Sequence, residues 1–76
     1  SDADAKVRRA LLELDPLYRE AVSLFHLDEM SYEEMSEITG VTVAALKQRV
    51  RRGREMLRDI IQQMYPDLAV ARMDDE

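Results

Sequence analysis

The chain contains no cysteine and no tryptophan, a single histidine and only two glycines among its 76 residues. Without cysteine there is no disulfide framework, no thiolate metal site and no cysteine nucleophile. No apolar run approaches the roughly 18 residues that a membrane span needs, and no segment resembles a signal peptide. We therefore expect one small cytoplasmic domain, stable by only a few kcal/mol.

The sequence also offers little for catalysis. His26, the single histidine, lies in an apolar stretch, where a surface or core role is commoner than a catalytic one. Glu33 and Glu37 are one helical turn apart, but no histidine accompanies them as a metal ligand. There is no glycine-rich phosphate loop. We therefore expect neither an enzyme nor a resident metal or cofactor.

Charged residues are abundant but unevenly distributed. The net charge is −5, yet residues 47–58 carry six basic side chains against Glu55, a local charge of +5. Residues 11–37 carry eight carboxylates against Arg19, a local charge of −7. A local field steers a polyanion over a Debye length of about 8 Å, so the basic segment suits nucleic-acid binding despite the negative total. The other interpretation, an ordinary solvated helix face, is distinguished only by where the segment lies in the fold.

Helical periodicity predicts an all-α fold with four helices. Apolar residues at helical spacing place the first helix at about residues 4–14. Asp15 and Pro16 then mark a new start, because Asp caps a helix and Pro fits its first position. This second helix ends near residues 27–30. Its predicted buried stripe consists of Leu17, Ala21, Leu24 and Phe25.

A short third helix follows. Ser31 and Glu34 have the spacing of a capping box, which predicts a helix over residues 32–39. We expect Met35 and Ile38 to face inward. The signals after this helix are Gly40 in a left-handed turn, Thr42 as the next N-cap and Pro66 as the limit of a long fourth helix.

The fourth helix has two distinct faces. Its apolar stripe has spacings of three and four and consists of Val43, Leu46, Val50, Gly53, Leu57, Ile60 and Met64. A glycine here costs about 0.5–1 kcal/mol relative to alanine, so we expect Gly53 to permit close approach of another helix. The opposite face carries Ala44, Lys47, Gln48, Arg51 and Arg52.

A short helix, a glycine turn and a long basic helix form the layout of a helix-turn-helix, whose second helix enters the DNA major groove. There Arg and Lys pair with guanine and Gln with adenine. The predicted DNA-binding residues are Thr42, Ala44, Lys47, Gln48, Arg51, Arg52 and Arg54. Thr42 begins the helix end that can hold a phosphate. Arg54 and Arg58 lie at the edge, suited to phosphate or to the acidic helices, while Arg49 is expected to point away and to be structural.

Most of the chain, about residues 5–62, resembles region 4 of the extracytoplasmic-function (ECF) sigma factors of bacterial RNA polymerase. The matching features are Leu14-Asp15-Pro16, Tyr18-Arg19-Glu20, Ser31-Tyr32-Glu33-Glu34, Glu37-Ile38 before Gly40, Lys47, Arg49, Arg52 and Arg54-Glu55. The resemblance implies a four-helix domain without a wing, whose long last helix recognises the minus-35 element of promoter DNA. It implies docking on the flap of the polymerase β subunit through the first two helices, and masking by an anti-sigma factor. Carried over by position, the DNA contacts would be Lys47, Gln48, Arg51 and Arg52.

The chain also departs from the family pattern. The departures are Ala44-Ala45-Leu46 where Gly-Thr-Val is common, Gln48 where serine is common, and Gly53 where alanine is usual. The promoter sequence of relatives should therefore not be transferred. Sigma region 2 is absent and the first residue is serine, so we expect a fragment or an isolated module. We assign residues 1–65 to the DNA-binding domain and residues 66–76 to a mobile acidic tail.

Two rival interpretations are compatible with the sequence. The first is a sigma-like interaction module that binds an anti-sigma factor without contacting DNA. The acidic surplus suits it, but the intact Lys47, Arg51 and Arg52 argue against it. The second is the C-terminal domain of a response-regulator-type activator. The Ser31-Tyr32-Glu33-Glu34 run favours the sigma interpretation over this one.

Overall fold

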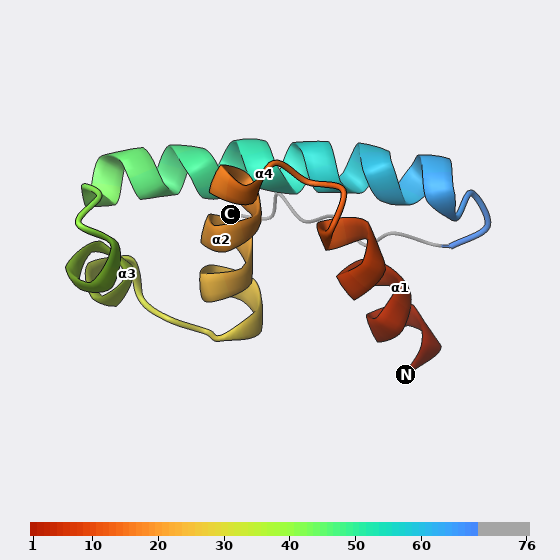
Figure 1. Ribbon diagram of the computed structural model, residues 1–76, viewed down its shortest axis with the longest axis horizontal. Coiled ribbons are helices and arrows are strands. Elements are labelled where there is room, and N and C mark those ends of the chain that lie inside the picture. The colour runs from red at the N-terminus through yellow and green to blue at the C-terminus, as the bar shows by residue number, and fades with distance from the viewer. Residues whose placement is uncertain (69–76) are drawn as a thin grey trace.

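The other helices all pack against one long helix. The computed structural model describes residues 1–68, and in that range every regular element is helical, as predicted. The elements are α1 (Asp2–Leu11), α2 (Pro16–Val22) with its π-helical continuation η1 (Ser23–Leu27), α3 (Tyr32–Thr39) and α4 (Val43–Met64). α4 runs along the longest dimension of the molecule, and α1, α2 and α3 all lie on one side of it (Figure 1). The opposite side of α4 is left uncovered.

The junction between α1 and α2 differs from the sequence prediction. α1 begins two residues earlier than expected, because Ser1 and Asp4 form a capping box at its start. It also ends earlier, at Leu11, and residues 12–14 form a turn. Arg19 stabilises this turn by donating hydrogen bonds to three main-chain oxygens, those of Leu11 (3.0 Å), Leu12 (3.2 Å) and Leu14 (3.0 Å). Asp15 caps α2 and Pro16 is its first residue, as predicted.

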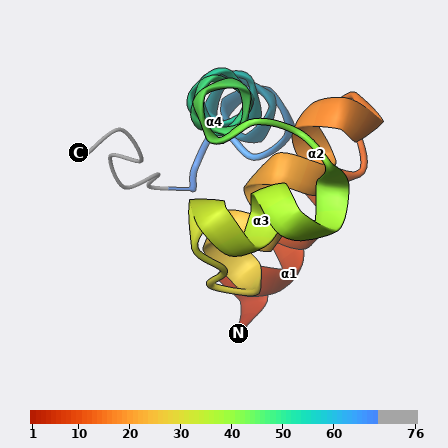
Figure 2. The ribbon, with the colours of Figure 1, turned by 90° about the vertical axis from the view of Figure 1, so that its left-hand side faces the viewer.

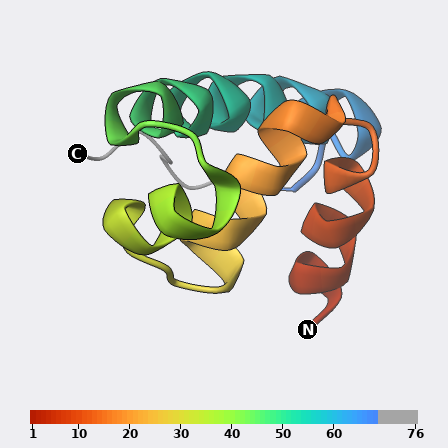
Figure 3. The same ribbon diagram turned by 60° about the vertical axis from the view of Figure 1, so that its left-hand side comes forward.

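The helix-turn-helix has the predicted bounds. α3 covers residues 32–39, and Ser31 and Glu34 form the expected reciprocal capping box, with hydrogen bonds of 2.9 and 3.0 Å. Gly40 adopts the left-handed conformation with φ of 75°, which costs glycine little. The Thr42 hydroxyl caps α4 by accepting the amide N–H of Ala45 at 3.2 Å. α3 and the first turns of α4 therefore meet across a short turn (Figure 3).

Two predicted inward residues are exposed instead. Ile38 is 63% exposed, because α3 packs inward through Tyr32, Met35 and Thr39. These three residues are spaced three and four positions apart and form the inward face of α3, so Ile38 lies outside that face. Leu17 is 44% exposed, because it lies at the first turn of α2, where only Ala45 and long polar side chains of α4 face it.

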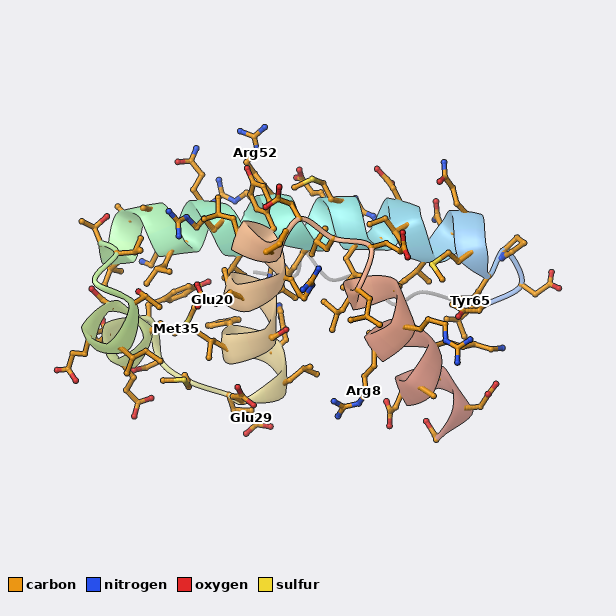
Figure 4. All side chains as sticks on the ribbon, in the orientation of Figure 1. Arg8, Glu20, Glu29, Met35, Arg52 and Tyr65 are labelled. Carbon is orange, nitrogen blue, oxygen red and sulfur yellow. The ribbon has the colours of Figure 1, made fainter. Side chains whose placement is uncertain are left out.

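The core consists of two clusters that share α4. The α1-side cluster contains Ala10, Leu11, Leu14, Val22, Leu57 and Ile61. The α3-side cluster contains Ala21, Met35, Leu46 and Val50. Figure 4 shows Met35 lying between α3 and α2. The predicted stripe of α4 is buried from Leu46 to Leu57. Val43 and Ile60 are only partly buried, Met64 is exposed, and Ile61, outside the predicted stripe, is buried.

Gly53 permits a close contact between α4 and α2, as predicted. A Cβ atom at this position would lie 2.6 Å from Cγ2 of Val22 and 3.3 Å from Cβ of Tyr18. Any side chain here would therefore push the two helices apart.

The C-terminal end of the described chain turns back toward the core. Residues 65–68 form a turn closed by a hydrogen bond from the Leu68 N–H to the Tyr65 oxygen, and Leu68 packs against the α1-side cluster. The rest of the predicted 66–76 tail, residues 69–76, lies outside the described residues. Within residues 1–68 no helix combines the length and apolar character that a membrane crossing requires.

Candidate nucleic-acid interface

The uncovered side of α4 carries a continuous row of exposed side chains. Viewed along its axis, α4 has the other helices on one side only (Figure 2). Ala44, Gln48, Arg51, Arg52 and Glu55 are exposed, at spacings of three and four that place them on one face. We call this set the exposed face of α4. Arg52 extends from it away from the rest of the molecule (Figure 4).

Lys47 lies at the α3 edge of the exposed face and is held by an aromatic pair. Its Nζ is 5.7 Å from the centroid of the Tyr32 ring, within the range of a cation–π interaction. The Tyr32 ring is stacked on Phe25, with a centroid distance of 4.5 Å and an interplanar angle of 20°. The first residue of α3 thus helps to position a cation of α4.

The N-terminal end of α4 is open to solvent. Thr42 and Ala44 are both exposed, and the first amides of any helix lack intrahelical acceptors. The Thr42 hydroxyl satisfies one of them, that of Ala45. This end of α4 therefore combines a favourable dipole with small side chains, so a backbone phosphate could approach it closely.

Several cations of α4 have no anionic partner among the residues that the structure describes. Lys47, Arg49, Arg51 and Arg52 make no ion pair and no hydrogen bond with other residues in the range 1–68. The exposed carboxylates of Glu33, Glu34 and Glu37 lie on α3. The positive charge of these four side chains is therefore directed outward and not consumed inside the fold.

Arg54 is not part of this outward set. It is only 8% exposed, because it follows Val50 by one turn and precedes Leu57, both of which are in the core. It lines a surface hollow together with Tyr32, Lys47 and Arg51, so its charge adds to the field there. Of the seven residues predicted from sequence to bind DNA, Arg54 is the one that has little surface to offer.

Arg49 occupies a place that the sequence did not suggest. It is partly exposed and lines a hollow of about 250 Å³ between α2 and α4, with Gln48 and Arg52 on the same rim. Leu17 and Tyr18 line the α2 side of this hollow. The structural role expected for Arg49 would need a partner, and residues 1–68 provide no hydrogen bond or ion pair for it. In the sequence, the spacing of three residues between Arg49 and Arg52 could have indicated that these two side chains lie near each other.

Within residues 1–68, the side chains around α4 do not form a metal site. The described part of the chain contains no group of three or more His, Cys, Asp or Glu side chains that could hold a metal ion. The chemistry available on α4 is charge and hydrogen-bond donation. Both suit a polyanion with polar base edges.

Comparison with known proteins agrees with this geometry. The family model described as sigma-70, region 4 matches residues 4–57. The chain therefore belongs to the sigma-70 region 4 family. Within that family it is similar to the ECF sigma factors, which confirms the resemblance seen in the sequence.

Three relatives illustrate the likeness. The RNA polymerase sigma factor CarQ of Myxococcus xanthus is 37% identical over 75 residues, covering 93% of this chain and 42% of the relative. The ECF RNA polymerase sigma factor SigE of Mycolicibacterium smegmatis is 39% identical over 57 residues, covering 75% and 22%. The ECF RNA polymerase sigma factor SigW of Bacillus subtilis is 38% identical over 52 residues, covering 68% and 28%. The chain spans less than half the length of these curated relatives. No solved structure matches it.

Proposed function

We propose that this domain binds promoter DNA in transcription initiation, as the region 4 domain of an ECF-type sigma factor that recognises the minus-35 element. The most direct support is a set of α4 cations, Lys47, Arg49, Arg51 and Arg52, that make no ion pair or hydrogen bond within residues 1–68 and lie on and beside the face that no helix covers. Membership of the sigma-70 region 4 family supports the promoter as the target. The names of the relatives support a role in RNA polymerase.

The geometry suits the major groove of duplex DNA. The groove is about 12 Å wide and admits one α-helix, and α4 presents an uncovered face of that kind along its length. In this orientation Gln48, Arg51 and Arg52 face the base edges, where Gln pairs with adenine and Arg with guanine. Lys47 lies at the edge and is available to a base or a phosphate. Ala44 leaves room for the backbone at the helix N-terminus.

The remaining surface suits protein partners. RNA polymerase core, through the flap of its β subunit, and an anti-sigma factor in the cytoplasm are the partners that the family membership suggests. Leu12 at the end of α1 and Leu27 at the end of η1 are both well exposed. They lie among the exposed carboxylates Glu13, Asp28 and Glu29. These are two separate apolar and acidic segments, one in the turn before α2 and one at the end of η1, where Glu29 lies far from α4 (Figure 4), and the second can contact a protein while α4 is on DNA.

The test is selection of bound sequences from a random duplex library, followed by affinity measurement on the enriched motif. Replacing Arg51 and Arg52 together by alanine should lower affinity by about 1–3 kcal/mol per arginine and abolish the enrichment. Arg8 and Arg9 on α1 are another exposed adjacent pair, so the Arg8→Ala/Arg9→Ala variant is a control with the same charge change. This control variant should retain the enriched motif and most of the parent's affinity for DNA. Equal binding by the Arg51/Arg52 variant and its parent would show that the exposed face of α4 does not contact DNA.

A further inference from the structure

The hollow beside Arg49 gives α4 a second basic edge. At about 100° per residue, Lys47 and Arg49 project about 200° apart around the helix axis, with Gln48 between them. Lys47 is therefore on the α3 side of the exposed face, and Arg49 is on the α2 side. A helix that presents Gln48 to the base edges has one of these cations toward each wall of the groove. The two walls are the two phosphate backbones.

The lining of the hollow is suited to a backbone segment. Arg49 provides a guanidinium group, while Gln48 and Arg52, which face the base edges in the proposed orientation, form the rim, and Arg52 adds positive charge nearby. The rest of the lining is Leu17, Tyr18 and Ala45, and no carboxylate is among the lining residues. The lining thus combines donors for phosphate oxygens with an apolar surface that can contact a deoxyribose ring. Guanidinium groups bind phosphate through two parallel hydrogen bonds, which gives geometry as well as charge.

We propose, on the basis of the DNA binding proposed above, that this hollow holds a phosphodiester group of the DNA strand on the α2 side. Arg49 is the principal phosphate ligand, and the exposed side chain of Leu17 contacts the adjoining sugar. Arg49 fixes the position of α4 in the groove and carries no base preference of its own. The first turn of α2 thereby becomes part of the DNA interface.

The test pairs an arginine substitution with single neutral phosphates in the DNA. Arg49→Gln keeps much of the side-chain length but removes the charge, and Arg8→Gln, on exposed α1, is the matched control. Duplexes carrying one methylphosphonate at each successive position are titrated with the parent and with both variants. We expect the parent to lose about five- to tenfold in affinity at one or two adjacent positions of one strand. The Arg49→Gln variant should lose nothing further at those positions.

Two further measurements distinguish the phosphate site at Arg49 from the proposed DNA binding by the domain as a whole. The slope of log affinity against log salt should become shallower by about 0.9 in Arg49→Gln, while the enriched motif stays the same. A parent that binds its motif, with Arg49→Gln retaining both the parental slope and the parental methylphosphonate profile, would overturn the phosphate site and leave the proposed function standing. A parent that binds no duplex would overturn both. Circular dichroism of each variant establishes that the fold is retained.

Discussion

At the scale of single residues, Gly53 decides how closely α2 and α4 approach. Gly53→Ala would bring a methyl group to within 2.6 Å of Val22 Cγ2. Overpacking of this kind costs about 1–3 kcal/mol, and the better helix propensity of alanine returns only about 0.5–1 kcal/mol. We expect Gly53→Ala to lower the free energy of unfolding by roughly 1–2 kcal/mol, measured by urea titration.

Val22 provides the control for this effect. In the Gly53→Ala/Val22→Ala double variant the clashing methyl group is gone. The two substitutions should therefore destabilise less together than the sum of their separate effects, by at least about 1 kcal/mol. Simple additivity would mean that the helices adjust freely and that Gly53 is not a packing requirement. The alanine usual in the family at this position would then fit here as well.

At the scale of the elements, the α1–α2 junction depends on Arg19. Its guanidinium donates to the main-chain oxygens of Leu11, Leu12 and Leu14, at the end of α1 and in the turn that follows; the Leu11 oxygen also accepts the N–H of Leu14. Lysine carries the same charge but lacks the planar fork, so Arg19→Lys should lower the free energy of unfolding by about 1–3 kcal/mol. Arg9→Lys on exposed α1 is the matched control and should be nearly neutral. If both variants unfold at the same urea concentration as the parent, the three hydrogen bonds contribute nothing net.

The elements also mark the limit of what the sequence could predict. Local signals such as the Ser31 capping box, Asp15 before Pro16, and Gly40 gave correct helix starts and stops, because capping depends on residues three or four positions apart. The exposure of Ile38 and the burial of Arg54 were not predictable in this way. Helical spacing places both residues at the edge of an apolar stripe, and whether a residue at such an edge is covered depends on how the neighbouring helices cross, which the spacing alone does not give.

For the candidate site too, local features could be predicted from the sequence and features made by tertiary packing could not. The exposed face of α4 follows from helical periodicity, so the exposure of Gln48, Arg51 and Arg52 on one face could be predicted from the sequence. The hollow beside Arg49 could not be predicted, because two of its six lining residues, Leu17 and Tyr18, come from the first turn of α2, some thirty residues earlier in the chain. Residues brought together by tertiary packing leave no periodic trace in a single sequence. Only the structure shows that these residues line the same hollow.

At the scale of the whole molecule, a basic α4 follows an acidic α3. Glu33 and Glu37 are exposed on α3, close in sequence to the turn that leads into α4. Two unit charges about 15 Å apart in water interact by about 0.3 kcal/mol before screening. Glu33→Gln/Glu37→Gln should therefore raise the affinity for any duplex by about two- to threefold at low salt.

This gain should be independent of DNA sequence and should disappear at high salt. At about 1 M salt the Debye length falls to roughly 3 Å, which removes repulsion over such distances. Titrations of the enriched duplex and of a scrambled duplex at low and high salt would measure both properties. A gain confined to the enriched duplex would instead indicate that α3 makes specific contacts with bases. A gain that persists at high salt would indicate a change of fold.

The uncovered face of α4 has a consequence for how this domain can change over evolutionary time. Core contacts of α4 use one side, through Leu46, Val50 and Leu57, while Gln48, Arg51 and Arg52 make no hydrogen bond or ion pair within residues 1–68. Surface substitutions that touch nothing usually change stability by less than about 0.5 kcal/mol. New target sequences can thus be acquired by replacing a few side chains without any compensating change in the core. Duplicated copies of such a domain are free to diverge in specificity while retaining one fold.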